Sequence, residues 1–304
     1  MQSIITRMDA APTTLTLAAA LAHATARLRQ APGVADGAAL DAQLLLAHVL
    51  ACPRSTLLAR DAEPLRADLA AVFGQLVARR ARGEPLAYIT GRRQFWTLEL
   101  QVSRAVLVPR PETELLVERC LALLRAPQAR VADLGTGSGA IALALASERP
   151  GWQITATDQS PAALAVAESN ARALGIGNVR FVRGSWFEPL ADERFELIAS
   201  NPPYVGARDP ALDDPALRHE PPAALSSGPS GLEALAALVG GAAAHLAADG
   251  HLVLEHGAGQ QHAVAELLVA QGFRHVRCHA DLAGLPRVTE AQRPAGRHIP
   301  AHRR

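Results

Sequence analysis

The last two thirds of the chain alternate short apolar runs with longer helical segments, and this alternation limits the possible folds more than any other feature of the sequence. The expected strands are RVADL, QITATD, VRFVRG, ELIAS, GHLVLEH, FRHVRCH and LPRVTEA. The expected helices between the early strands are AIALALASER, PAALAVAESNARALG and LEALAALVGGAAAHLA. Strands joined through helices predict an α/β fold, a mostly parallel sheet with helices on both faces. Only a short loop separates the last two strands, so the seventh is expected to run antiparallel.

The first part of the chain, residues 1–83, has a different pattern and predicts a small helical domain. Apolar residues recur there at helical spacing, at Leu17, Leu21, Ala24 and Leu28 and again at Leu40, Leu44, Ala47 and Leu50. Residues 84–110 change to a two-residue alternation in QFWTLELQV, which predicts one strand with AVLVP as its partner. We therefore expect a β-hairpin linker at 84–110, an α/β catalytic domain at 111–292 and a flexible basic tail at 293–304.

Composition excludes several classes of protein. The formal net charge is only +1, so a strongly basic nucleic-acid surface is not expected. The three cysteines form no CxxC pair, which argues against a disulfide framework or a zinc site and fits a reducing compartment. The sequence contains no long uncharged apolar stretch and no clear leader. We expect a cytoplasmic protein with no metal, no membrane segment and no direct contact with nucleic acid, and a monomer because no coiled-coil pattern is present.

A glycine-rich loop follows the first strand of the α/β domain. In DLGTGSGA, Gly135, Gly137 and Gly139 allow a sharp turn and close approach of a ligand, and a helix N-terminus with free N–H groups comes next. The second strand ends at Asp158, where a carboxylate can accept both hydroxyls of a ribose. The loop also satisfies a loose dinucleotide pattern, so it indicates a nucleoside-bearing cofactor without deciding between S-adenosylmethionine and a nicotinamide dinucleotide.

The fourth strand ends in SNPPY, residues 200–204. The two prolines restrict the backbone, and ligands of open α/β sheets lie at this edge. The Asn201 side-chain oxygen and the carbonyl of Pro202 can each accept an N–H from a planar, weakly nucleophilic nitrogen, and Tyr204 can cover its face. Such a site would catalyse mainly by positioning, an effect that can reach about 7–11 kcal/mol.

These motifs together resemble the class I S-adenosylmethionine-dependent methyltransferases, in the branch whose (N/D)PPY motif methylates nitrogens. The series GEPLAYITGRRQFWTLELQV, VLVPRPETELLV, DLGTGSGAIALALA, SNPPY with RHEPPAAL, LVLEHG and the D-x-x-G-x-x-R stretch at 281–287 is similar to the HemK/PrmC protein-glutamine methyltransferases. The match extends from about residue 40 to 290. The resemblance implies a Rossmann-like seven-stranded sheet and methyl transfer to the glutamine of the GGQ motif in class 1 peptide chain release factors, which modulates translation termination.

The resemblance also implies roles for individual residues. The cofactor contacts would be Gly135, Thr136, Gly137, Ser138, Gly139, Asp158 on the ribose, Trp186 beside the adenine, and Asn201. The glutamine pocket would be formed by Asn201, Pro202, Pro203 and Tyr204. Many relatives have an acid just before the tryptophan, whereas this chain has Ser185, so adenine binding is expected to be looser or rearranged.

Two roles are possible for each of four other residues. Arg110 and Glu112 could line the mouth of the site or cap the helix near Thr113. Glu220 could order the loop after SNPPY or contact the substrate, and His256 could form a hydrogen bond behind the site or touch the cofactor.

Three other functions are compatible with single motifs of the sequence. A DNA adenine-amino methyltransferase also acts on a planar amine, but it must grip phosphates. A nicotinamide oxidoreductase shares the glycine loop and has no use for SNPPY. A non-catalytic binding module would use the helical domain to hold a partner; we expect instead that this domain docks the release factor.

Overall fold

The computed structural model describes residues 15–294, which fall into two compact units divided between Thr90 and Gly91. The expected basic tail at 293–304 lies outside the described residues from position 295 onward, as do the first 14 residues of the expected helical domain. Among the described residues, no helix is both long enough and apolar enough to cross a membrane.

The first unit is helical. Its helices are α1 (Leu17–Arg29), α2 (Ala38–Val49), α3 (Arg54–Leu58), α4 (Ala67–Ala81) and α5 (Leu86–Thr90). The Thr16 hydroxyl caps α1 by accepting the N–H of Ala19. The apolar stripe of α1 packs on α2, where Leu45 and Leu46 are completely buried. Helix α5 occupies part of the range expected as a linker.

The second unit contains a seven-stranded sheet in the order β5-β4-β3-β6-β7-β9-β8. Its strands are β3 (Ala129–Leu134), β4 (Trp152–Asp158), β5 (Val179–Arg183), β6 (Phe195–Ser200), β7 (Leu246–Glu255), β8 (Arg274–Ala280) and β9 (Pro286–Gln292). Strand β9 is antiparallel to both neighbours, and the other pairs are parallel. The expected fold class, a seven-stranded mostly parallel sheet, is confirmed.

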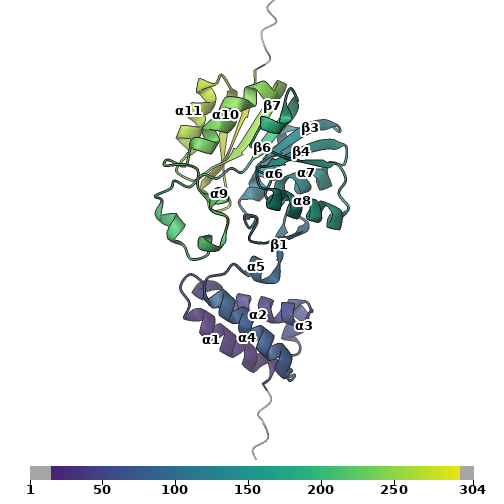
Figure 1. The fold of residues 1–304 in the computed structure, drawn as a ribbon, viewed down its shortest axis with the longest axis vertical. Helices are drawn as coiled ribbons and strands as arrows, with labels where there is room; N and C mark the ends of the chain where they lie inside the picture. The colour runs from purple at the N-terminus through teal and green to yellow at the C-terminus, as the bar shows by residue number, and fades with distance from the viewer. Residues whose placement is uncertain (1–14, 295–304) are drawn as a thin grey trace, which may run out of the picture. The chain divides into compact units, whose positions relative to one another are not determined.

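Two layers of helices cover this sheet (Figure 1). The helices of the layers are α6 (Thr113–Leu123), α7 (Ala140–Glu148), α8 (Pro161–Leu174), α10 (Glu233–His245) and α11 (Gln261–Ala270), and the short α9 (Pro222–Leu225) lies in the connection from β6 to β7. Helices α6, α7 and α8 share one core with Val131 of β3, whereas α10 and α11 share another with its neighbour Ala132. Because successive side chains of a strand point to opposite faces, both faces of the central strands are apolar.

The prediction that QFWTLELQV forms one strand paired with AVLVP was wrong. The hairpin lies inside that stretch: β1 (Arg92–Phe95) pairs antiparallel with β2 (Leu98–Gln101), and the chain turns at Trp96, which has φ 56°. The backbone N–H of Trp96 donates to Glu114 at 2.9 Å, and its ring N–H donates to Glu148 at 2.8 Å. These distant acceptors stabilise a left-handed residue that the two-residue alternation does not reveal.

Candidate functional site

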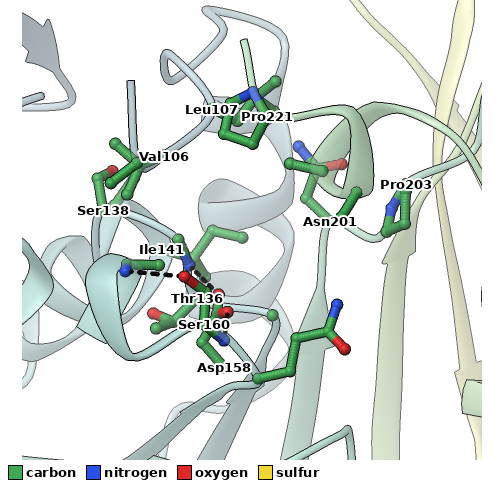
Figure 2. Close-up of a pocket in the computed structure, with 18 of the residues that line it drawn as sticks. Val106, Leu107, Thr136, Ser138, Ile141, Asp158, Ser160, Asn201, Pro203 and Pro221 are labelled. Atoms are coloured by element: carbon green, nitrogen blue, oxygen red, sulfur yellow. Dashed lines mark hydrogen bonds between the residues drawn. The ribbon is translucent and has the colours of Figure 1, made fainter. Parts of the chain in front are cut away.

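A cavity of about 240 Å³ lies at the carboxyl ends of β3, β4 and β6. Figure 2 shows Asn201 and Pro203 on one side of it, Val106 and Ser138 on the other, and Asp158 with Ser160 between them. The sequence-predicted residues on its wall are Gly135, Thr136, Gly137, Ser138, Asp158, Trp186, Asn201 and Pro203. The remaining three, Gly139, Pro202 and Tyr204, are next to lining residues in the sequence but do not line the cavity themselves.

The glycine loop owes its shape to three left-handed residues. Gly135, Gly137 and Gly139 have φ angles of 77°, 57° and 84°, and residues other than glycine rarely adopt such values. A Cβ atom on Gly135 would lie 3.1 Å from the ring of Trp186, so the loop and that ring are closely packed. Gly139 is the N-cap of α7, and a Cβ atom there would lie 3.0 Å from Leu143.

The loop is connected to the two neighbouring acids. Thr136 donates its hydroxyl hydrogen to Asp133 Oδ2 at 2.6 Å, and the N–H of Gly137 donates to Asp158 Oδ2 at 2.9 Å. Oδ1 of Asp158 accepts the N–H of Ser160, also at 2.9 Å. Each oxygen of Asp158 keeps a further lone pair for a ligand hydroxyl. The carboxylate therefore faces the cavity in one defined orientation.

Trp186 lines the cavity beside Ser185, at the edge formed by β4 and β5. Its backbone is left-handed, with φ 47°, and its carbonyl accepts the hydroxyl of Thr157 at 3.2 Å. Ser185 is exposed, and its N–H donates to the carboxylate of Glu188 at 3.3 Å. The wall at this position thus offers an indole and a hydroxyl to a ligand.

Asn201 follows β6 and presents its amide to the cavity. Nδ2 donates to the Thr113 hydroxyl at 3.1 Å, which leaves Oδ1 available to accept a hydrogen bond. Pro202 is buried, and Pro203 lies on the wall. The hydroxyl of Tyr204 donates to Glu255 Oε1 at 3.4 Å, and neither residue lines the cavity. Burial raises the pKa of Tyr204, so this hydroxyl remains protonated.

Two buried carboxyl groups lie close behind the cavity. Burial raises the pKa of Asp133 to about 7, although hydrogen bonds from Thr136 and the Ala142 N–H oppose the shift. Burial also raises the pKa of Glu255 to about 7, and here hydrogen bonds from Thr113 and Tyr204 act against it. Oδ1 of Asp133 and Oε2 of Glu255 are buried without a partner among the described residues. Both acids therefore change charge near neutral pH.

The structure also places the residues that the sequence left open. Arg110 lines the cavity and forms an ion pair with Glu220, 2.5 Å apart, while the other oxygen of Glu220 accepts the N–H of Val108 at 3.0 Å. Glu220 is 3% exposed and joins the segment 108–110 to the loop that follows SNPPY. Glu112 occupies the N-cap of α6 without a side-chain cap bond. His256 is fully buried, and its ring nitrogens form hydrogen bonds with the carbonyl of Gly257 and the hydroxyl of Thr289, behind the site.

Sequence reasoning missed Thr113 and Glu255 as site residues. Each stands beside a residue that was noticed, in PRPET and LVLEHG, but neither motif indicates that Thr113 accepts from Asn201 or that Glu255 accepts from Tyr204. It also missed the wall formed by Ala105, Val106 and Leu107, which had been expected to belong to a strand. Within residues 15–294, no group of three or more His, Cys, Asp and Glu side chains is arranged to hold a metal ion.

Comparison with known proteins adds independent information. Residues 19–91 match the PrmC N-terminal domain, and residues 111–213 match the Methyltransferase small domain. A release factor glutamine methyltransferase of Xylella fastidiosa is 50% identical, over 91% of this chain and 98% of its own length. The enzyme of the same name from Vibrio cholerae is 46% identical, over 91% of this chain and 97% of its own length. A methyltransferase structure from Pyrococcus furiosus, 19% identical, superposes with a TM-score of 0.52 over 71% of this chain and 98% of that one, a likeness of fold.

Proposed function

The chain belongs to the release factor glutamine methyltransferase family, and from this premise we propose that the cavity described above carries the family's reaction on the GGQ glutamine of a class 1 release factor. The protein is an S-adenosylmethionine-dependent protein-(glutamine-N5) methyltransferase. The observation that carries the proposal is the position of Asn201: this residue, whose Nδ2 is engaged by Thr113, lines the same cavity as the glycine loop and Asp158.

The residues present fit the cofactor. The left-handed glycines allow close approach of a ligand, and a Cβ atom on Gly135 would meet Trp186. Asp158 would accept the ribose hydroxyls, and Trp186 would lie beside the adenine, with Ser185 as the neighbouring polar group. When bound, S-adenosylmethionine supplies an electrophilic methyl group on a cationic sulfur.

Asn201 and its neighbours would prepare the substrate. The glutamine side-chain nitrogen is a poor nucleophile because its lone pair is delocalised into the carbonyl. Oδ1 of Asn201 would accept one of its two N–H groups and help to direct the lone pair toward the methyl group. The second acceptor would be the carbonyl of Pro202, which adjoins the wall residues Asn201 and Pro203 without itself lining the cavity. Pro203 supplies part of the wall, and Tyr204 supports the segment from behind. These residues orient the nitrogen as the S–CH3 bond breaks and the N–CH3 bond forms, and the proton that the methylated nitrogen loses would pass to water.

We also propose how the protein meets its substrate. The helical unit before Gly91 would dock the release factor, so that the other unit receives only the glutamine loop. The chain would act as a monomer, in the cytoplasm where translation occurs, without direct contact with nucleic acid or membrane.

The decisive experiment is to incubate the purified protein with S-adenosylmethionine and a release factor and to map the added mass by peptide mass spectrometry. We expect one methyl group on the GGQ glutamine. If the factor stays unmodified under conditions where the cofactor binds, the proposed substrate is overturned. Methyl transfer to duplex DNA would then be measured, to test whether adenine is the acceptor.

A further inference from the structure

The turn between β8 and β9 presents two leucines to solvent. In the part of the unit after Thr90 that the structure describes, the exposed large apolar side chains are Val269, Leu282 and Leu285. Leu282 is fully exposed and Leu285 is 44% exposed, and both lie in the turn 281–285. Single apolar side chains are common on protein surfaces, but two in one turn mark a candidate contact surface. We call Leu282 and Leu285 the turn leucines.

The turn has one defined conformation. Oδ1 of Asp281 accepts the N–H groups of Ala283 and Leu285, each at 2.9 Å. Its Oδ2 accepts the Nε–H of Arg287 at 3.1 Å, and its backbone N–H donates to the carbonyl of Leu285 at 2.9 Å. A surface that is ordered before association loses little conformational entropy when a partner binds. The turn leucines are therefore displayed on a preformed support.

The turn lies at the same edge of the sheet as the cavity. Strand β9 runs antiparallel to β7, and Val288 near its beginning pairs with Glu255, the last residue of β7. The turn that precedes β9 is therefore beyond the carboxyl end of β7, at the edge where Asn201 follows β6. Only β7 separates β6 from β9, which corresponds to two strand spacings, or roughly 10 Å.

Hydrogen bonds connect the turn with the chain around Tyr204. Nε2 of Gln260 donates to the carbonyl of Tyr204 at 2.9 Å, and its Oε1 accepts the N–H of Gly257 at 2.8 Å. The neighbouring N–H of His256 donates to the carbonyl of Arg287 at 2.9 Å. Arg287 also donates to the aspartate of the turn. Bonded residues as well as the sheet geometry thus fix the turn relative to the cavity.

A protein substrate has to cross this edge. The cavity measures about 240 Å³, so the release factor can insert only a small part of its chain and must lie against the edge around the opening. An extended chain spans about 3.3 Å per residue, so residues roughly three to five positions from the glutamine would lie level with the turn. A standard interface covers about 800 Å² on each partner, a patch roughly 30 Å across, which is wide enough to include both the cavity and the turn.

We propose that the turn leucines are a docking contact for the glutamine loop of the release factor, where they pack on apolar side chains in the stem of that loop. The partner surface must be apolar because a leucine side chain offers no polar group to pair with. This contact rests on the proposed function, since it requires a release factor as substrate. It holds the loop without touching the reacting atoms.

The test compares two substrates of the full-length protein at saturating S-adenosylmethionine, the intact release factor and a short peptide with two residues on either side of the GGQ glutamine. The double variant Leu282→Ser/Leu285→Ser should raise the KM for the intact factor roughly tenfold, because two apolar side chains no longer leave water on binding. Its kcat, its KM for the peptide and its affinity for S-adenosylmethionine should stay close to wild type. Leu282→Met, which keeps an apolar side chain of similar volume, should retain the wild-type KM for the factor.

The matched control is Val269→Ser. Val269 is 62% exposed near the end of α11, and β8, which follows, runs parallel to β7 and begins at the opposite edge of the sheet. The KM of this variant should be unchanged for both substrates, and a rise equal to that of the double variant would overturn the proposal. Light scattering should give the same mass for the wild type and the double variant. If only the wild type forms a dimer, the turn leucines join two copies of this chain and the proposal is overturned.

The two proposals fail in different ways. A wild-type chain that transfers no methyl group to the factor overturns the proposed function and, with it, the docking contact. If the wild-type chain does transfer it, and the double variant keeps the wild-type KM for the factor or loses equally on the factor and the peptide, only the docking contact is overturned.

Discussion

The backbone N–H of Gly137 donates to Oδ2 of Asp158 at 2.9 Å, so the glycine loop after β3 and the acid at the end of β4 form one hydrogen-bonded unit. The same carboxylate accepts the N–H of Ser160 through its other oxygen. Backbone donors therefore set the direction in which its free lone pairs point. An acid held in this way contributes both to the shape of the loop and to any ligand hydroxyl in the cavity.

Replacing Asp158 should weaken cofactor binding. Asp158→Ala removes two charge-assisted acceptors, each worth about 1.5–3 kcal/mol, so the Kd for S-adenosylmethionine should rise at least about tenfold. Asp158→Asn keeps one acceptor for Gly137 and should lose less. Isothermal titration calorimetry checks both values, and an unchanged Kd for Asp158→Ala would contradict the assignment.

Gly135 should tolerate a side chain less well than Gly137. Alanine at either position costs about 1–2 kcal/mol because both glycines are left-handed. Only the Cβ atom at Gly135 would press on Trp186, whereas nothing lies within 4 Å of the one at Gly137. Gly135→Ala should therefore lose more cofactor affinity than Gly137→Ala at a similar loss of thermal stability. Equal Kd values for the two variants would argue against close packing of loop and ring.

Asn201→Ala should separate binding from turnover. Without Oδ1 the glutamine nitrogen is no longer oriented, and kcat should fall by at least about 100-fold, as when an oriented hydrogen-bonding group is removed from an active site. The glycine loop and Asp158 are untouched, so cofactor affinity should remain close to wild type. Methyl transfer to the release factor is the assay, and normal turnover would show that Asn201 does not orient the substrate.

Removal of the helical unit should affect a protein substrate and a peptide substrate differently. A chain without residues 1–90 should show a KM for intact release factor raised by about tenfold or more, a loss of about 1.4 kcal/mol or more in docking. Its KM for a short GGQ peptide should change little. Equal losses on the two substrates would mean that the unit supports folding or catalysis rather than docking.

Asp133 should make the protein less stable as the pH rises from about 4 to 7. Its pKa is raised to about 7 in the folded chain, so the folded state binds more protons than the unfolded state in that range and the free energy of unfolding decreases with pH. Asp133→Asn removes the buried charge and should stabilise the protein at pH 7.5 by about 2–4 kcal/mol relative to the wild type. Urea denaturation at pH 5 and pH 7.5 measures this. If the difference in unfolding free energy between Asp133→Asn and the wild type is the same at pH 5 and at pH 7.5, the raised pKa of Asp133 is contradicted.

Much of the catalytic unit follows from local patterns. The run that ends in Leu134, the one that ends in Asp158 and the one that ends in Ser200 were all expected as strands, and each is one. The sequence also placed the loop and SNPPY after these strands, so their approach at one sheet edge was predictable. The hairpin was not, because the turn at Trp96 depends on acceptors on α6 and α7.

The sequence by itself therefore determined the alternation of strands and helices, the glycines that the loop requires, and the side chains that end each strand, because these depend on residues a few positions apart. Only the tertiary structure decided that β9 lies between β7 and β8, that Arg110 pairs with Glu220, and that Asn201 donates to Thr113. Such contacts join residues far apart along the chain. They exist only once packing has excluded water and brought distant segments together, so no local periodicity encodes them.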